Sequence, residues 1–156
     1  MSWVRCRTLH VLLIIGLAMT LASCSSVRSR EEREEREARI NVYPENYRAD
    51  LLAALHTYVS DPTHIRDAFV SEPALKPVGR QNRYAACVRF NARNSDGRYV
   101  GSKDVLAIFV AGRFDQFIDT SVQLGPTNEP NRSAVAKELC DTAEYRRFPE
   151  LEALAR

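Results

Sequence analysis

The sequence predicts an α+β domain whose sheet is antiparallel. Three observations favour it: apolar residues at helical spacing over residues 44–59, segments of period two between residues 65 and 119, and a second helical segment that ends near Cys140. A run of consecutive strands between helices is typical of antiparallel sheets. We therefore expect an N-terminal amphipathic helix packed on a small antiparallel sheet, followed by a short C-terminal helix.

The first predicted element is an amphipathic helix of about 16 residues that begins near Pro44. Tyr47, Leu51 and Leu55 recur at a spacing of four and form one apolar face. Proline fits the first turn of a helix, where its missing N–H has no partner to lose. The helix is expected to end at Asp61-Pro62, because the residue before a proline disfavours helical conformation.

Two strands at the centre of the chain predict a hairpin with a long polar connection. Residues 83–91 alternate in polarity, and residues 105–111 are continuously apolar, which predicts a central strand covered on both faces. Residues 94–97 (Asn-Ser-Asp-Gly) are a turn signal, since glycine tolerates a positive φ. The apolar face of the first strand is expected to carry Tyr84, Ala86, Val88 and Phe90.

The segments around this hairpin have weaker patterns. Residues 65–71 are expected to form a short strand, broken afterwards by Pro73, Pro77 and Gly79. Residues 113–119 either continue the second hairpin strand or start another, and residues 124–131 read as a loop.

The C-terminal part is expected to cover the sheet. Ser133 is predicted to cap a short helix that runs through Cys140. After it, residues at spacings of three or four are expected to pack on the domain, namely Tyr145, Phe148, Leu151 and Leu154.

Length and composition agree with one globular domain. The chain has 156 residues, and 45% of them are hydrophobic, too high a share for a wholly disordered protein. With 6 Gly and 7 Pro it is not collagen-like. A formal net charge of +2 gives no indication of nucleic-acid binding.

The N-terminus has the pattern of an export signal. Arg5 and Arg7 precede an apolar run over residues 9–21, which is shorter than the roughly 20 residues of a membrane-spanning helix. The tetrapeptide Leu21-Ala22-Ser23-Cys24 follows, and it resembles the lipobox of bacterial lipoproteins. The resemblance implies that residues 1–23 are removed, that a diacylglycerol is attached to the Cys24 thiol, and that the new amine is acylated, for example with palmitate. An ordinary secretory signal or an uncut anchor is the alternative.

This resemblance also implies an address. Ser25 follows the lipidated position where aspartate would favour inner-membrane retention, so the outer membrane, with the protein facing the periplasm, is the expected location. Two or three acyl chains hold a protein on a membrane where a single chain would not. Loss of Arg5 and Arg7 would leave a mature chain with as many basic as acidic side chains.

A charged tether is expected over residues 24–42, ahead of a periplasmic domain over residues 43–156. Residues 28–39 hold five Arg and five Glu and no apolar stripe, so this segment reads as a solvated, partly helical spacer. The alternative is a segment that contacts lipid headgroups or a partner. Residues 61–73 and 88–99 of the domain resemble small uncharacterised proteobacterial envelope lipoproteins, which implies an address and no activity.

The cysteines predict one disulfide. Cys6 is lost with the signal and Cys24 carries the lipid, which leaves Cys87 and Cys140 as a pair in an oxidising compartment. Two buried free thiols, or a nucleophilic thiol, are the alternatives. His56 and His64 would be the only imidazoles of the mature chain, too few for a metal site of ordinary composition, and we expect no metal and no cofactor.

Charge is segregated along the chain. Residues 76–113 contain eight basic and two acidic side chains, whereas the segments on either side are net acidic. One hypothesis is that acidic neighbours neutralise these cations within the fold. The other is a surface for an anionic partner: lipid headgroups, lipopolysaccharide phosphates, cell-wall carboxylates or an acidic protein. The candidate residues are Arg83, Arg89, Arg93, Arg98 and Lys103.

These features favour a non-enzymatic module for binding, or for envelope assembly and maintenance, with no nucleic-acid partner. A small envelope hydrolase that uses His64 with Asp61 or Asp67 is the competing hypothesis. A module that inhibits an enzyme is a third, which the sequence does not distinguish from the first.

Overall fold

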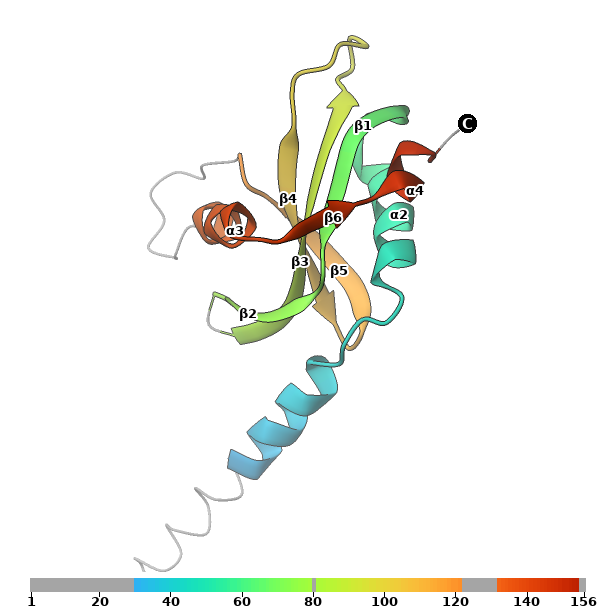
Figure 1. Cartoon of the computed structure of the whole chain (residues 1–156). Coiled ribbons are helices and arrows are strands. Elements are labelled where there is room, and N and C mark those ends of the chain that lie inside the picture. Colours follow the sequence, from blue (N-terminus) through green and yellow to red (C-terminus); the bar gives the residue numbers. More distant parts are fainter. Residues whose placement is uncertain (1–29, 80, 122–131, 155–156) are drawn as a thin grey trace, which may run out of the picture. The chain divides into compact units, whose positions relative to one another are not determined.

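The computed structural model describes residues 30–79, 81–121 and 132–154 (Figure 1). The chain divides into two compact units, residues 1–39 and residues 40–156, and each is described by itself. The tetrapeptide that resembles a lipobox, residues 21–24, and the predicted loop over residues 124–131 lie outside the described residues.

Residues 30–40 form a helix whose side chains up to Arg39 are all exposed. Two ion pairs with a spacing of four stabilise it: Arg30 to Glu34 at 2.9 Å and Arg39 to Glu35 at 3.3 Å. No helix of the described residues is long and apolar enough to cross a membrane.

Residues 40–156 form an α+β unit around a six-stranded sheet, so the predicted fold class is confirmed. The strand order is β5-β4-β3-β1-β6, β2 pairs with β3 off this path, and all neighbours are antiparallel. The elements are α2 (Tyr47–Tyr58), β1 (Asp61–Ser71), β2 (Ala74–Val78), β3 (Gln81–Arg93), β4 (Lys103–Val110), β5 (Arg113–Asp119), α3 (Arg132–Asp141), β6 (Tyr145–Arg147) and α4 (Pro149–Glu152).

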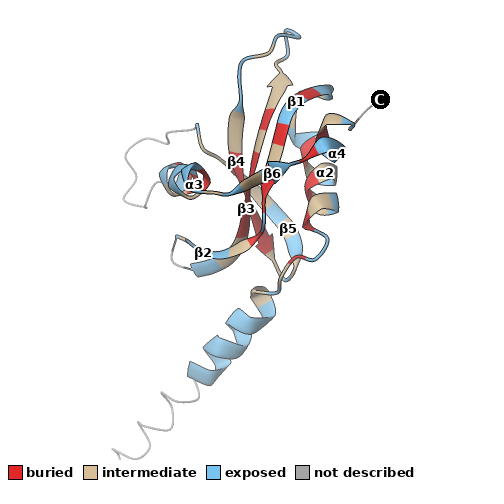
Figure 2. Cartoon of the chain, viewed as in Figure 1, coloured by how far each residue is buried: buried red, intermediate tan, exposed pale blue. Residues whose placement is uncertain are grey.

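The hairpin β3–β4 forms the centre of the sheet, and both of its faces are covered, as the apolar run predicts (Figure 2). One face packs against α2 and α4 through Leu51, Leu55 and Leu151. The other face packs against α3 through Ala136 and Cys140. Figure 1 shows α2 and α3 on opposite sides of the sheet.

Several predicted boundaries are wrong for identifiable reasons. Helix α2 has 12 residues and begins after Asn46, so Pro44 precedes the helix and is buried instead of occupying its first turn. Strand β1 begins at Asp61, immediately after α2, and Pro62 is accommodated near its first residue. Ser133 is the second residue of α3 and is buried.

Two further elements differ from the prediction. Residues 74–78, read as broken by proline, form strand β2, in which Pro77 pairs with Asn82. Proline is tolerated there because β2 lies at an edge of the sheet. The tail forms strand β6 and the short helix α4 in place of one apolar helical stripe, yet its predicted packing is confirmed, since Phe148 and Leu151 are fully buried.

Candidate functional site

Strand β3 carries three of the predicted basic residues on one face. The even-numbered residues from Tyr84 to Phe90 belong to the core beneath α2. Successive side chains of a strand point to opposite faces, so Arg83, Arg89 and Arg93 share the face on which α3 packs. Helix α3 covers the middle of that face through the disulfide from Cys87 to Cys140, whose Cα atoms are 5.4 Å apart. The predicted disulfide is therefore present, and its sulfurs are buried.

Arg89 is held within the fold. Its Nε and one terminal nitrogen donate to the two carboxylate oxygens of Asp104 at 2.7 and 2.8 Å, a bidentate pair between directly opposed residues of β3 and β4. The guanidinium also lies 4.4 Å from the ring centroid of Tyr145. Burial, together with the negative charge of Asp104, raises the pKa of Tyr145 to about 12. This guanidinium is committed to structure.

Lys103 is also paired, and it lies on the other face of the sheet. It sits opposite Phe90, with Nζ 2.6 Å from Asp119 Oδ2 and 5.0 Å from the ring centroid of Tyr58. The Tyr58 hydroxyl donates to the same oxygen of Asp119 at 3.1 Å. Burial alone would raise the pKa of Asp119, but hydrogen bonds from Lys103 and Ser121 outweigh it and lower the pKa to about 2.

Arg93 has a different environment. It is the last residue of β3, where the connection to β4 begins. Its guanidinium carbon lies 5.3 Å from the ring centroid of Tyr99, and that of Arg66 lies 4.0 Å from the same ring. Arg66 faces Asn91 across the β1–β3 pairing, and Tyr99 forms a bridge with Arg93. We call Arg66, Asn91, Arg93 and Tyr99 the Tyr99 cluster.

The Tyr99 cluster contains polar groups without partners. Among the described residues, neither Arg66 nor Arg93 forms an ion pair with a carboxylate. Arg93 Nε and Asn91 Oδ1 are buried and have no hydrogen-bond partner in the structure. Buried polar atoms are nearly always hydrogen-bonded in native proteins, so these two atoms on one strand face have room for a polar partner that the described residues do not supply.

The ring of Tyr99 is fixed in this cluster because its hydroxyl donates to the carbonyl oxygen of His64 at 2.8 Å. Arg98, which directly follows the turn over residues 94–97, is exposed, and its guanidinium lies 3.3 Å from the carboxylate of Asp96. Sequence reasoning named Arg93 and Arg98 but missed Arg66 and Tyr99. Arg66 belongs to a segment that is acidic by count, and only its pairing with β3 reveals its position.

Arg83 lies at the opposite end of β3. Its guanidinium donates to the carbonyl oxygen of Asn82 at 2.6 Å and to the side-chain oxygen of Gln81. Directly opposite on β2 is Lys76. The five predicted basic residues are thus split among two ends of the sheet and two internal ion pairs.

His64 does not have the geometry of a hydrolase relay. The Thr63 hydroxyl donates to Asp61 Oδ1 at 2.5 Å, and His64 Nδ1 lies 2.6 Å from that hydroxyl oxygen and 3.8 Å from Asp61 Oδ2. In a catalytic triad the imidazole stands between hydroxyl and carboxylate, whereas here the hydroxyl stands between the other two. No hydrogen bond or ion pair joins His64 to Asp67, which has a left-handed φ of 51°. The described residues also contain no cluster of histidine, cysteine and carboxylate side chains that could hold a metal ion.

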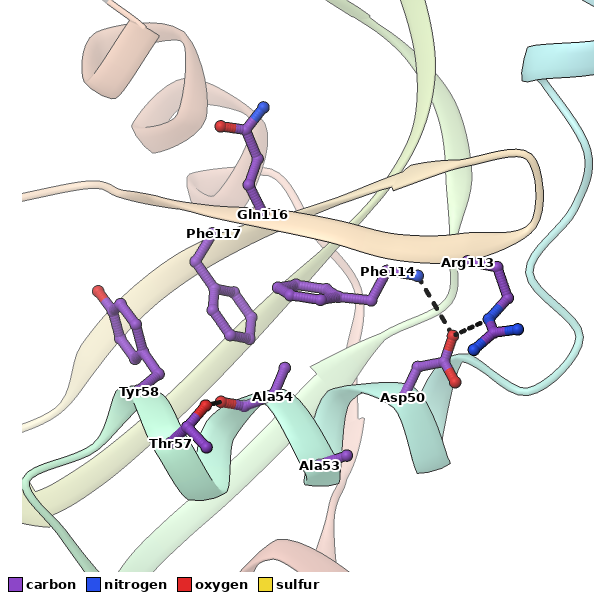
Figure 3. Close-up of a pocket in the computed structure, with 9 residues that line it drawn as sticks. All are labelled: Asp50, Ala53, Ala54, Thr57, Tyr58, Arg113, Phe114, Gln116 and Phe117. Atoms are coloured by element: carbon purple, nitrogen blue, oxygen red, sulfur yellow. Dashed lines mark hydrogen bonds and ion pairs between the residues drawn. The ribbon is translucent and has the colours of Figure 1, made fainter.

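An apolar groove of about 690 Å³ lies between α2 and β5 (Figure 3). Phe114 and Phe117 project from β5 towards α2, with ring centroids 4.5 Å apart, and Tyr58 lies 4.9 Å from Phe117. Between Asp50 and Tyr58 the helix lines the groove with the small side chains Ala53, Ala54 and Thr57, which leave the rings partly uncovered.

The groove's one carboxylate is already engaged. Asp50 Oδ2 accepts the backbone N–H of Phe114 at 3.2 Å and lies 3.9 Å from Arg113 Nε. The described lining contains no histidine or cysteine. The groove therefore joins the edge strand to the helix through ring contacts and one side-chain hydrogen bond to the backbone.

These features define an antiparallel α+β domain with one helix fixed by a disulfide, and with an arginine–tyrosine cluster at one end whose cations form no ion pair with a described carboxylate. No protein family, curated protein or solved structure matches the chain.

Proposed function

We propose that this protein is a lipid-anchored component of the bacterial envelope that binds an anionic partner through the Tyr99 cluster. The lipobox supports the anchor at Cys24 and, with Ser25, an outer-membrane location facing the periplasm. The observation that carries the binding function is the contrast among cations: Arg89 and Lys103 form close ion pairs, whereas Arg66 and Arg93 flank one aromatic ring and form none with a described carboxylate. Asp61, the β1 partner of Arg93, has its pKa lowered mainly by hydrogen bonds from Thr63 and to a smaller extent by the charge of Arg93.

The chemistry of the cluster favours a carboxylate or phosphate group. Two guanidinium groups supply several N–H donors in planar forks, which match the oxygens of such groups. The tyrosine ring holds both cations in place, so binding costs little side-chain entropy. Asn91 Oδ1 adds an acceptor for a hydroxyl or amide next to the anion.

The cluster's position favours a partner away from the anchoring membrane. The tether joins the domain at the turn between β4 and β5, where the carbonyl oxygen of Ile40 accepts the N–H of Ala111 at 2.7 Å. The Tyr99 cluster lies at the other end of β4, whose 8 residues span about 25 Å. Figure 1 shows the connection over residues 94–102 and the β4–β5 turn at opposite ends of the sheet.

The binding proposal is tested by charge reversal. Arg66→Glu with Arg93→Glu is expected to abolish salt-sensitive capture of isolated cell walls or of crosslinked acidic envelope proteins, while Arg132→Glu, an exposed cation on α3, leaves capture unchanged. Arg66→Lys with Arg93→Lys keeps the charge but loses the planar fork, so partial loss is expected. Undiminished capture by a folded double-Glu variant would show that the cluster is not the site.

The anchor has its own test. Cys24→Ala is expected to leave the protein unprocessed or to release it into the soluble periplasmic fraction. Intact mass of the membrane-extracted protein is expected to show acyl chains on a chain that begins at Cys24. An unmodified full-length chain in the cytosol would refute the anchor.

The hydrolase alternative predicts a different outcome for one variant. The Thr63 hydroxyl lies between His64 and Asp61, which is not the order of a catalytic relay. We therefore expect no catalytic role for His64, and His64→Ala should leave partner binding intact. Loss of function in cells by His64→Ala, with binding retained, would instead favour a catalytic role.

A further inference from the structure

Exposed apolar side chains are rare on this domain, and two of them lie where the tether joins it. Of the large hydrophobic residues that the structure describes, only four are exposed: Val42, Tyr58, Leu75 and Val100. Val42 lies against the β4–β5 turn, since a Cβ at Gly112 would be 3.3 Å from its Cγ1. Leu75 belongs to the same end, because it pairs with Tyr84.

The connection between these two residues is direct. The ring of Tyr43, next to Val42, packs edge-on against the ring of Tyr84 at 5.4 Å between centroids. Tyr84 is the β3 partner of both Leu75 and Phe109, and Phe109 pairs with Phe114 just after the turn. Val42 and Leu75, each 47% exposed, therefore flank one aromatic row at the end of the sheet that the tether reaches.

Basic side chains lie at the same end of the sheet as this apolar pair, and two of them, Lys76 and Arg83, project from the face opposite Leu75 and Tyr84. Lys76 and Arg83 are opposed across β2 and β3, and no carboxylate of the described residues forms an ion pair with either. Arg113, at the β4–β5 turn, has a side chain that is 84% exposed and lies 3.9 Å from Asp50. We call Val42, Leu75, Lys76, Arg83 and Arg113 the tether-side surface.

We propose that the tether-side surface rests on an anionic lipid bilayer, and this inference builds on the lipid anchor of the proposed function. Apolar side chains that enter the headgroup region beside cations that stay at its surface are the composition of interfacial membrane contacts. Each basic residue near an anionic membrane surface strengthens partition about fivefold. The predicted tether over residues 24–42 would keep the surface close to the membrane, so even a weak contact would be populated.

This contact would also orient the domain. With the tether-side surface on the bilayer, the Tyr99 cluster at the other end of β4 points away from the lipid. The membrane would thereby present the cluster to its partner, and the two basic surfaces would meet different anions.

Tryptophan fluorescence in the full chain tests this. The single tryptophan of the sequence, Trp3, lies in the segment that cleavage before Cys24 removes, and Trp3→Phe keeps the background free of tryptophan in any uncut chain. In this background Leu75→Trp reports on the tether-side surface, and Val100→Trp, 73% exposed at the other end, is the matched control. Each protein is extracted from cells and reconstituted into phosphatidylcholine vesicles with brominated acyl chains, with and without phosphatidylglycerol. Quenching is expected at position 75 in the phosphatidylglycerol vesicles and absent at position 100.

Charge reversal sharpens the expectation. Lys76→Glu with Arg83→Glu is expected to remove the quenching at position 75, as is high salt, without altering the circular dichroism of the protein. Flotation of the protein with vesicles but no quenching at position 75, or equal quenching at position 100, would refute the membrane contact of the tether-side surface but not the lipid anchor. Quenching without stable flotation would support the surface and overturn the anchor, and the absence of both would overturn both.

Discussion

Reduction of the disulfide is expected to destabilise the domain by about 4 kcal/mol, because the bridge closes a loop of residues 87–140 in the unfolded chain. The loop-closure entropy depends on the logarithm of the sequence separation, which is 53 residues here. The expected destabilisation therefore changes little with the exact loop length. This is a large fraction of the stability of an ordinary domain.

The loss should be concentrated in α3. That helix buries only Ser133, Ala136 and Cys140, all of them small, so little apolar area holds it to the sheet without the bridge. On the other face, α2 is held by Tyr47, Leu51 and Leu55 and does not depend on a crosslink. In the reduced protein we therefore expect α3 amides to exchange hydrogen faster while α2 amides keep most of their protection.

The assay compares two states of one protein. Half of a sample is reduced in denaturant and refolded with reductant, and guanidinium unfolding of both halves is followed by far-ultraviolet circular dichroism. The reduced half is expected to unfold at a lower midpoint and with a larger m value, because its unfolded state is less compact. Cys24→Ala is the control, since loss of the Cys24 thiol should leave the difference between the oxidised and reduced midpoints unchanged. Equal midpoints, with reduction verified by intact mass, would refute the reasoning.

Two further predictions concern single residues. The pKa of Asp119 is lowered to about 2, so its contribution, about 2 kcal/mol at most, is present above pH 4 and is lost as the pH falls from about 4 to about 2; Asp119→Asn should flatten the acid side of the stability profile, measured by denaturant unfolding at each pH, and an unchanged profile would contradict it. Gly112→Ala should destabilise the domain more than Gly97→Ala. Both glycines have a positive φ, which costs an alanine about 1–2 kcal/mol, but only at Gly112 would the new Cβ also lie 3.3 Å from Val42 Cγ1. Equal midpoints of thermal unfolding would show that the β4–β5 turn moves to accommodate the new Cβ.

The hairpin β3–β4 could be predicted because its signals are local. Alternation over residues 83–91, a glycine-containing turn and a continuous apolar run each point to a strand or its end, and tertiary contacts reinforce them. Strand β2 could not, because Pro77 is excluded from a central strand and accepted at an edge, and position in the sheet is a property of the whole fold.

The basic site was predicted only in part because charge counts along a chain ignore pairing. Arg89 and Asp104 are 15 residues apart in sequence but directly opposed in the hairpin, so the cation and its partner were counted in the same basic segment. Arg66 was counted as part of an acidic segment. The pairing of β1 with β3 has two register irregularities, one between Asp61 and Arg66 and one between Arg66 and Phe69. The sequence of β1 does not predict them.

Antiparallel topology explains how one basic stretch of sequence makes two surfaces. In a hairpin, the start of the first strand and the end of the second share one end of the sheet. Arg83 and the β4–β5 turn with Arg113 therefore lie at one end of the sheet, where Ile40 bonds to Ala111, while Arg93 and the connection with Arg98 lie at the opposite end. Between them Asp104 and Asp119 neutralise the two cations that remain, Arg89 and Lys103.

This arrangement makes the two proposed contacts separable. Reversing the charges of Lys76 and Arg83 should abolish the contact of the tether-side surface with the bilayer without weakening capture of the anionic partner by the Tyr99 cluster. Reversing the charges of Arg66 and Arg93 should abolish capture and leave the bilayer contact intact. Exposed charges separated by about 25 Å interact little at physiological salt, where the screening length is about 8 Å. Any coupling between the two sets of variants would then have to arise from the orientation that the membrane gives the domain, so it should disappear in detergent.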